Sequence, residues 1–237
     1  YSAHARVIQA RTYEGRLDDT NVFLKDLLDE RKTNDSGLGM LREKFFSKPD
    51  PSGRGVIFVD IGPAIANLTS PGVTAVSIAR DFPSMTVVAI DLPEQVDIFK
   101  TSVDSTLRNR VLAFPNFYVL AGNGVFPIFD QFGDRAKWVK SFEIPADLNG
   151  RPFVFRAANS IDIYESWNAN REALARIALD FPASPILYLF NRSILFKPVG
   201  SSSFKIIGIV SQAGFDHQNE TFDRKGDAAY ILSPSAL

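Results

Sequence analysis

The sequence predicts an α/β fold, in which a doubly wound sheet of mostly parallel strands carries an antiparallel strand at its C-terminal end. Residues 56–61 and 86–91 are two runs rich in apolar and β-branched side chains, and each has an acidic residue at or next to its end. Between them, residues 73–82 carry apolar side chains at helical spacing. A βαβ unit with buried parallel strands has this pattern.

The C-terminal part of the chain predicts the antiparallel strand. Residues 204–210 and 228–232 have the composition of strands, and the polar segment 212–227 joins them. Because this connection has no apolar helical stripe, an antiparallel pair is favoured over two parallel strands joined by a helix.

The other elements follow from helical stripes, short apolar runs and breaker residues. Pro93 and Glu94 begin a helix as helix starts prefer, and Pro182 ends a later one. Residues 125–151 are the least regular part, where we expect a short helix and extra strand pairing. In chain order, the expected elements are helices at 20–32 and 40–46, a helix to about 110, a strand at 117–120, a strand with its following loop at 152–164, a helix at 168–181 and a strand at 186–190.

Composition excludes several kinds of function. The 237 residues are 45% hydrophobic and 22% charged, enough to bury a core without metal or disulfides. The 26 basic and 27 acidic residues nearly cancel, which argues against a nonspecific nucleic-acid binder. There is no cysteine, and His4 and His217 are the two histidines, so we expect no metal site. No membrane span or signal-peptide pattern occurs, and we expect a cytoplasmic location with no membrane partner.

Two residues predict a small-molecule site. Gly62 follows the first strand and Asp91 ends the second. In open α/β sheets, ligands bind beyond the carboxyl ends of the strands, and an acid about 20 residues past the glycine turn commonly binds ribose hydroxyls. We therefore expect a ligand beside Gly62 and Asp91.

The order of these elements resembles the class I S-adenosylmethionine-dependent methyltransferases, in which an acidic-x-Gly-x-Gly-x-Gly turn follows the first strand. Here Ala64 and Ala66 stand where that family most often has its second and third glycines. The resemblance covers about residues 56–232. It implies a Rossmann-like methyltransferase fold at 51–237, a helical cap at 1–50, S-adenosylmethionine as cofactor and methyl transfer to an acceptor, which we expect to be a small molecule.

The resemblance also implies site residues, although it identifies no catalytic residue. Residues 122–124 match the turn at which many of these enzymes hold the adenine amino group, and Asn159 and Tyr164 follow the fourth strand near the reacting centre. The implied cofactor-binding residues are Asp60, Gly62, Ala64, Asp91, Leu92, Gly122, Asn123 and Asn159, and Tyr164 is implied to line the acceptor pocket.

Other interpretations stay open. Gly62 and Asn123 have ordinary roles in turns, and Asp91 in a helix cap. The leading helices either cover the pocket or simply pack on the sheet. The two alanines favour a noncatalytic binding module with a methyltransferase-like fold. A nicotinamide-dependent oxidoreductase shares the βαβ unit, but the sequence has no Tyr-x-x-x-Lys and the reversed C-terminal strand fits it poorly.

Overall fold

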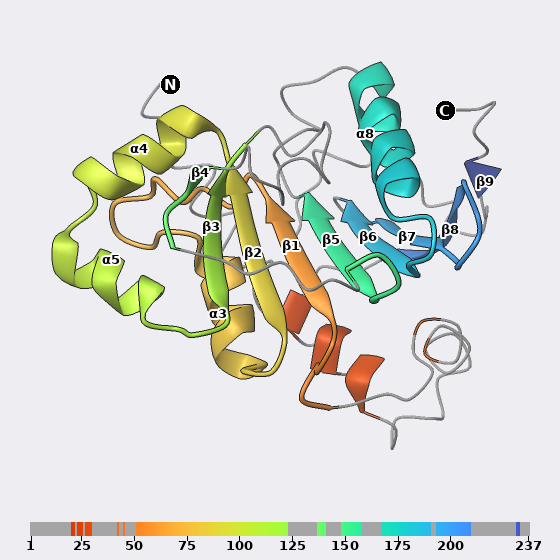
Figure 1. The fold of residues 1–237 in the computed structure, drawn as a ribbon, viewed down its shortest axis with the longest axis horizontal. Coiled ribbons are helices and arrows are strands. Elements are labelled where there is room, and N and C mark those ends of the chain that lie inside the picture. The colour runs from red at the N-terminus through yellow and green to blue at the C-terminus, as the bar shows by residue number, and fades with distance from the viewer. Residues whose placement is uncertain are drawn as a thin grey trace.

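The computed structural model describes residues 20–21, 23–25, 27–29, 42, 45, 51–122, 137–140, 148–157, 167–190, 193–209 and 231–232. Within these residues, nine strands form one sheet in the order β4-β3-β2-β1-β5-β6-β7-β8-β9 (Figure 1). Five adjacent strands are parallel to one another: β3 Phe117–Ala121, β2 Thr86–Asp91, β1 Ile57–Ile61, β5 Phe153–Ala157 and β6 Ile186–Phe190.

Helices cover both faces of this parallel core. The described helices are α3 Val73–Asp81, α4 Pro93–Thr101, α5 Ser105–Leu112 and α8 Trp167–Asp180. Buried side chains of α3, α4 and α5 join one hydrophobic cluster, with alternate residues of the strands such as Phe58 and Val154. Buried side chains of α8 join the second cluster, with the intervening strand residues such as Val59 and Phe155. Two faces buried in this way confirm the doubly wound, Rossmann-like α/β fold predicted from the apolar runs.

The helix expected to run to about residue 110 is two helices. α4 ends at Thr101, and α5 starts at Ser105. The carboxylate of Asp104 accepts hydrogen bonds from the N–H groups of Thr106 and Leu107, at 2.9 and 3.1 Å. An aspartate at this position starts a new helix. The prediction followed the apolar face across the break, because Val103 remains buried.

The antiparallel part of the sheet is larger than expected. β8 Phe204–Ile209 and β9 Ile231–Leu232 are antiparallel, as predicted. The prediction missed β7 Ser193–Lys197, which forms a tight hairpin with β6 and lies between β6 and β8. β4 Lys137–Trp138 pairs with β3 and is the extra strand pairing expected within residues 125–151.

Lys197 ties the hairpin to the end of α8. Its side chain is fully buried, and Nζ donates to the backbone oxygens of Phe181 and Ser184, at 3.1 and 2.9 Å. These oxygens lie just beyond the C-terminal end of α8, where backbone carbonyls lack helical partners. The buried lysine thus satisfies them and anchors β7 beside the end of the helix.

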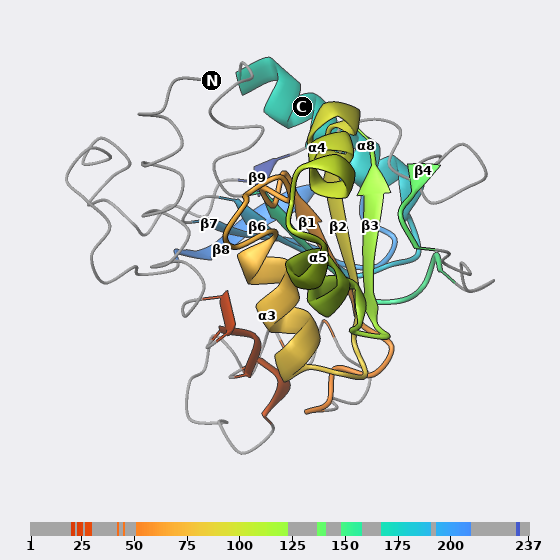
Figure 2. The same ribbon diagram turned by 90° about the vertical axis from the view of Figure 1, so that its left-hand side faces the viewer.

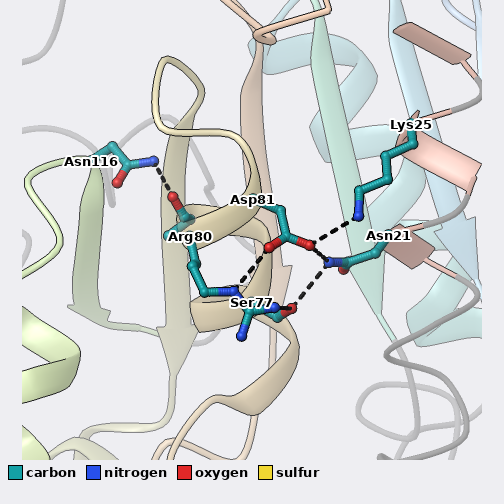
Figure 3. Close-up of polar contacts among 7 residues, drawn as sticks. Asn21, Lys25, Ser77, Arg80, Asp81 and Asn116 are labelled. Carbon is teal, nitrogen blue, oxygen red and sulfur yellow. Dashed lines mark hydrogen bonds and ion pairs between the residues drawn. The ribbon is translucent and has the colours of Figure 1, made fainter. Parts of the chain in front are cut away.

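The described residues of the first helix pack against α3 (Figures 2 and 3). Leu24, Leu27 and Leu28 are buried in the cluster on the α3 face. Asn21 Nδ2 donates to Ser77 Oγ at 3.0 Å and to Asp81 Oδ2 at 2.6 Å. Asp81 ends α3, which returns the chain from the carboxyl edge of β1 to the start of β2.

These contacts therefore lie at the edge of the sheet opposite the carboxyl ends of the parallel strands. Of the two interpretations of the leading helices, they support packing on the sheet. The division into residues 1–50 and 51–237, and a cap over the site, stay predictions.

Candidate functional site

Three charged side chains lie in the five parallel strands, and all three are on the α3 face. They are Asp60 in β1, Asp91 in β2 and Arg156 in β5. Successive strand residues alternate between faces, and the neighbours two positions earlier, such as Phe58 and Val154, belong to the cluster on the α3 face. Each charged residue is the last or second-last of its strand. Together they form a buried charge cluster at the carboxyl edge, where the sequence predicts the ligand.

Asp60 and Arg156 form a buried ion pair across β1 and β5. Arg156 Nη1 donates to Asp60 Oδ1 at 2.8 Å, and the exposed fractions of the two side chains are 0% for Asp60 and 3% for Arg156. Burial raises the pKa of Asp60, and the adjacent guanidinium opposes this effect. The second oxygen, Oδ2, has no hydrogen-bond partner among the described residues.

Arg156 was missing from the sequence prediction. A basic residue inside the otherwise apolar run 153–157 is unusual, because an arginine is almost never fully buried unless it is paired. The basic residue in an apolar strand was therefore the signal in the sequence that pointed to a buried acidic partner. The partner could not be named from the sequence, because it lies 96 positions away.

Asp91 is turned toward the backbone around it. Its Oδ2 accepts from the N–H of Ile65 at 3.0 Å, and Oδ1 accepts from the N–H of Leu92 at 2.9 Å. The residue is 7% exposed. Burial raises the pKa of Asp91 to about 6, against the effect of the backbone N–H groups, and the charge of Asp60 raises it further. Asp91 does not cap α4. The N-cap residue of this helix is Leu92, and no side chain makes a capping hydrogen bond at its N-terminus.

The turn after β1 uses two left-handed residues. Gly62 has φ 66°, and its N–H continues the ladder by donating to the oxygen of Ile90 at 2.8 Å. Ala64 has φ 57°, and it is the one non-glycine residue with positive φ in the described part of the chain. For an alanine this conformation costs roughly 1–2 kcal/mol. The Ile65 N–H bond to Asp91 helps to hold it there.

The carboxyl edge brings together most of the predicted cofactor residues. Leu92 is 44% exposed, and it places an apolar surface next to Asp91. The N–H of Gly122, just past β3, donates to the backbone oxygen of Asp91 at 2.9 Å. Asp60, Gly62 and Ala64 lie on the adjoining strand and turn. Asn123, Asn159 and Tyr164 lie outside the described residues.

Within the described residues, no group of three or more His, Asp or Glu side chains is placed to hold a metal ion. In the same part of the chain, no helix is both long and apolar enough to cross a membrane.

Comparisons with known proteins find likenesses to solved structures alone. No protein-family model matches the sequence, and no curated protein matches it. Three solved chains match, among them a structure described as "PigF with SAH", at a TM-score of 0.37 and 15% sequence identity. That alignment covers 66% of this chain and 36% of the solved chain, so this chain spans about a third of the length of the protein it matches.

Proposed function

We propose that this protein binds S-adenosylmethionine at the carboxyl edge of β1, β2 and β3 and transfers its methyl group to a small molecule. The observation that supports this best is the direct link between the β1 turn and the acid at the end of β2, through the Ile65 N–H bond to Asp91. The link lies at the carboxyl end of β1. This strand has β2 on one side and β5 on the other, and the order of the strands in the sheet reverses here. Open α/β sheets bind nucleotide-like ligands at such a point.

The described residues fit an adenosine-containing cofactor. The Asp91 carboxylate accepts hydrogen bonds from the backbone N–H groups of Ile65 and Leu92, and a hydrogen bond from the N–H of Ala64 also lowers its pKa. Because a carboxylate offers about four acceptor positions, Asp91 can hold the turn and still accept a ribose hydroxyl. Leu92 offers exposed apolar surface for an adenine ring, and Gly122, which has no side chain, lies at the end of β3.

The chemistry supplied by the cofactor is an activated methyl group on a sulfonium. The role proposed for this chain is to align the acceptor with that group and to exclude water. Such positioning contributes much of the acceleration of group transfer without a dedicated base. We assign Asp91, Leu92, Gly62 and Gly122 to cofactor binding and no residue to acid–base catalysis.

A noncatalytic binding module is the second candidate, and a specific observation favours it. Ala64 holds a left-handed conformation without a glycine, and the Asp91 carboxylate is engaged by the turn. A site that had lost its ligand would keep such internal contacts for stability alone. The two candidates differ in whether the cofactor binds.

Calorimetric titration with S-adenosylhomocysteine tests the proposal on the wild type, Asp91→Ala and an Ala64→Gly/Ala66→Gly variant. A charge-assisted hydrogen bond contributes roughly 1.5–3 kcal/mol, so Asp91→Ala should weaken binding about 10- to 150-fold. The double-glycine variant should bind as well as the wild type or better. Glu94→Gln, an exposed acid near the site, is the control and should bind like the wild type.

Binding below detection at millimolar ligand, in both the wild type and the double-glycine variant, would favour the noncatalytic module. NAD and NADP titrated in parallel test the oxidoreductase alternative. A shift in thermal stability should accompany any true ligand, since binding to the native state raises its stability.

A further inference from the structure

We propose that the buried charge cluster of Asp60, Asp91 and Arg156 makes this site prefer a positively charged ligand, so that it binds S-adenosylmethionine more tightly than S-adenosylhomocysteine. The inference rests on the proposed function, because it concerns the selectivity of the same site. It identifies Asp91 as a specificity-determining residue.

The cluster carries an excess negative charge. Two carboxylates and one guanidinium sum to −1 when all three are ionised, and their residues are between 0% and 7% exposed. Asp60 and Arg156 neutralise each other across β1 and β5. The excess charge therefore belongs to Asp91.

No cation balances Asp91 among the described residues. Its carboxylate is held by the backbone N–H groups of Ile65, Leu92 and Ala64, which are dipoles and not charges. The charge facing it from β1 is Asp60, which repels it, and Arg156 of β5 is paired with Asp60. On the β3 side, Ala121 and Gly122 carry no charge, and in the first turn of α4 the exposed Glu94 is acidic. A buried carboxylate in these surroundings attracts a ligand cation, since solvent screens it weakly.

The two ligands differ in the charge of their sulfur atom. S-adenosylmethionine has one more methyl group and a positive charge on sulfur, and S-adenosylhomocysteine is its neutral counterpart at that atom. The sulfur is bonded to the C5′ carbon of the ribose that Asp91 is proposed to hold. The charge difference between the ligands therefore lies four bonds from the nearest ribose hydroxyl oxygen that Asp91 is proposed to hold.

The preference should follow the ionisation of Asp91. Burial raises the pKa of this carboxyl to about 6, and as a result it is largely charged at pH 7.5 and largely neutral at pH 5. The dissociation constant of S-adenosylhomocysteine divided by that of S-adenosylmethionine should therefore fall as the pH is lowered from 7.5 to 5. Burial also raises the pKa of Asp60, and the Arg156 charge offsets only part of that shift, so a proton taken up by Asp60 would lower the ratio in the same direction.

The test is the dissociation constant of each ligand, measured by calorimetry for wild type, Asp91→Asn and Glu94→Gln at pH 7.5 and pH 5. At pH 7.5 the wild type should favour S-adenosylmethionine by about tenfold, which corresponds to roughly 1.4 kcal/mol. In Asp91→Asn the ratio should approach one at both pH values. Glu94→Gln should retain the wild-type ratio, since it removes an acid exposed to solvent. Comparing ratios cancels the contribution of the extra methyl group.

Asp60→Asn is a second variant, in case Asp91→Asn disturbs the turn. It leaves Arg156 without its partner and makes the cluster neutral, so it should lower the ratio as well, and thermal unfolding checks that this variant still folds. Equal binding of both ligands to the wild type, or a preference that persists in both variants, would overturn the inference and leave the proposed function standing. Failure of both ligands to bind the wild type would overturn the proposed function itself.

Discussion

Arg156 lies directly opposite Asp60 on the neighbouring parallel strand, and its Nη1 donates to Asp60 Oδ1 over 2.8 Å in the interior of the protein. Both side chains belong to strands at the point where the order of the sheet reverses. Removing both charges from water is costly, and the pair is tolerated because each charge offsets the other. The consequences for stability differ depending on whether one or both partners are removed.

Arg156→Met should lower the free energy of unfolding by about 3–5 kcal/mol, because it leaves Asp60 as a buried charge without its partner. The Asp60→Leu/Arg156→Met variant should recover much of this loss, since it removes both desolvation costs. Urea denaturation at pH 7.5 measures all three proteins. A double variant as unstable as Arg156→Met would show that packing, and not charge, dominates at this position.

The carboxyl of Asp91 should make stability depend on pH. Its pKa is raised from the ordinary value of 3.8 to about 6 by burial, so the folded state binds a proton more tightly than the unfolded chain. The favourable contribution is complete below about pH 4 and is lost as the pH rises through 6. The difference between these two pKa values corresponds to roughly 3 kcal/mol.

Asp91→Asn removes this titration. The free energy of unfolding of the wild type minus that of the variant should therefore decrease as the pH rises from 4 to 7. The pKa of Asp60 is also raised and Asp60 interacts with Asp91, so their coupling remains in the difference and acts in the same direction. Urea denaturation at pH values between 4 and 7 supplies the curve. A difference that stays constant or rises with pH would contradict a raised pKa at this position.

Ala64→Gly should stabilise the protein by up to about 1.5 kcal/mol. Relief of a left-handed alanine is worth roughly 1–2 kcal/mol, and the extra freedom of glycine in the unfolded chain costs about 0.5–1 kcal/mol. Ala66→Gly is a matched control in the same turn, because Ala66 does not have a positive φ. That control should be destabilising. Thermal unfolding of both variants checks the signs, and equal destabilisation by both would mean that Ala64 is unstrained.

Asp81 should anchor the first helix to α3. Burial acts to raise the pKa of Asp81, but side-chain hydrogen bonds from Arg80 and Asn21 lower it below its ordinary value, and Lys25 Nζ lies 3.3 Å from Oδ2 (Figure 3). Asp81→Ala should cost about 1–3 kcal/mol, since it removes charge-assisted hydrogen bonds.

Hydrogen exchange of residues 20–28 should increase in Asp81→Ala, while affinity for any ligand at the carboxyl edge stays unchanged, because the anchor lies at the opposite edge. Arg80→Ala is the matched control; its side chain is 63% exposed, and its surface ion pair should contribute less than about 1 kcal/mol. Unaltered exchange in Asp81→Ala would mean that Leu24, Leu27 and Leu28 hold the helix without the polar contacts.

Some predictions from the sequence failed for local reasons. The break at Asp104 was passed over because Val103 on its N-terminal side stays buried and continues the apolar pattern. β7 was missed because it follows β6 after a very short connection. Antiparallel neighbours can be joined by a hairpin, so no intervening helical pattern marks the second strand in the sequence. Periodicity reports which residues are buried, and it is less informative about where the chain reverses.

The sequence by itself determined the βαβ unit, the two faces of the parallel core and the position of Gly62 and Asp91 at strand ends, because burial imposes a periodicity that can be read residue by residue. Only the tertiary structure decided that Arg156 pairs with Asp60 and that the Asp91 carboxylate turns toward the N–H of Ile65. These contacts join residues that are 96 and 26 positions apart, so they depend on strand order, register and side-chain direction. None of those three is encoded in a local pattern, since they arise only when separate segments compete for the same buried partners.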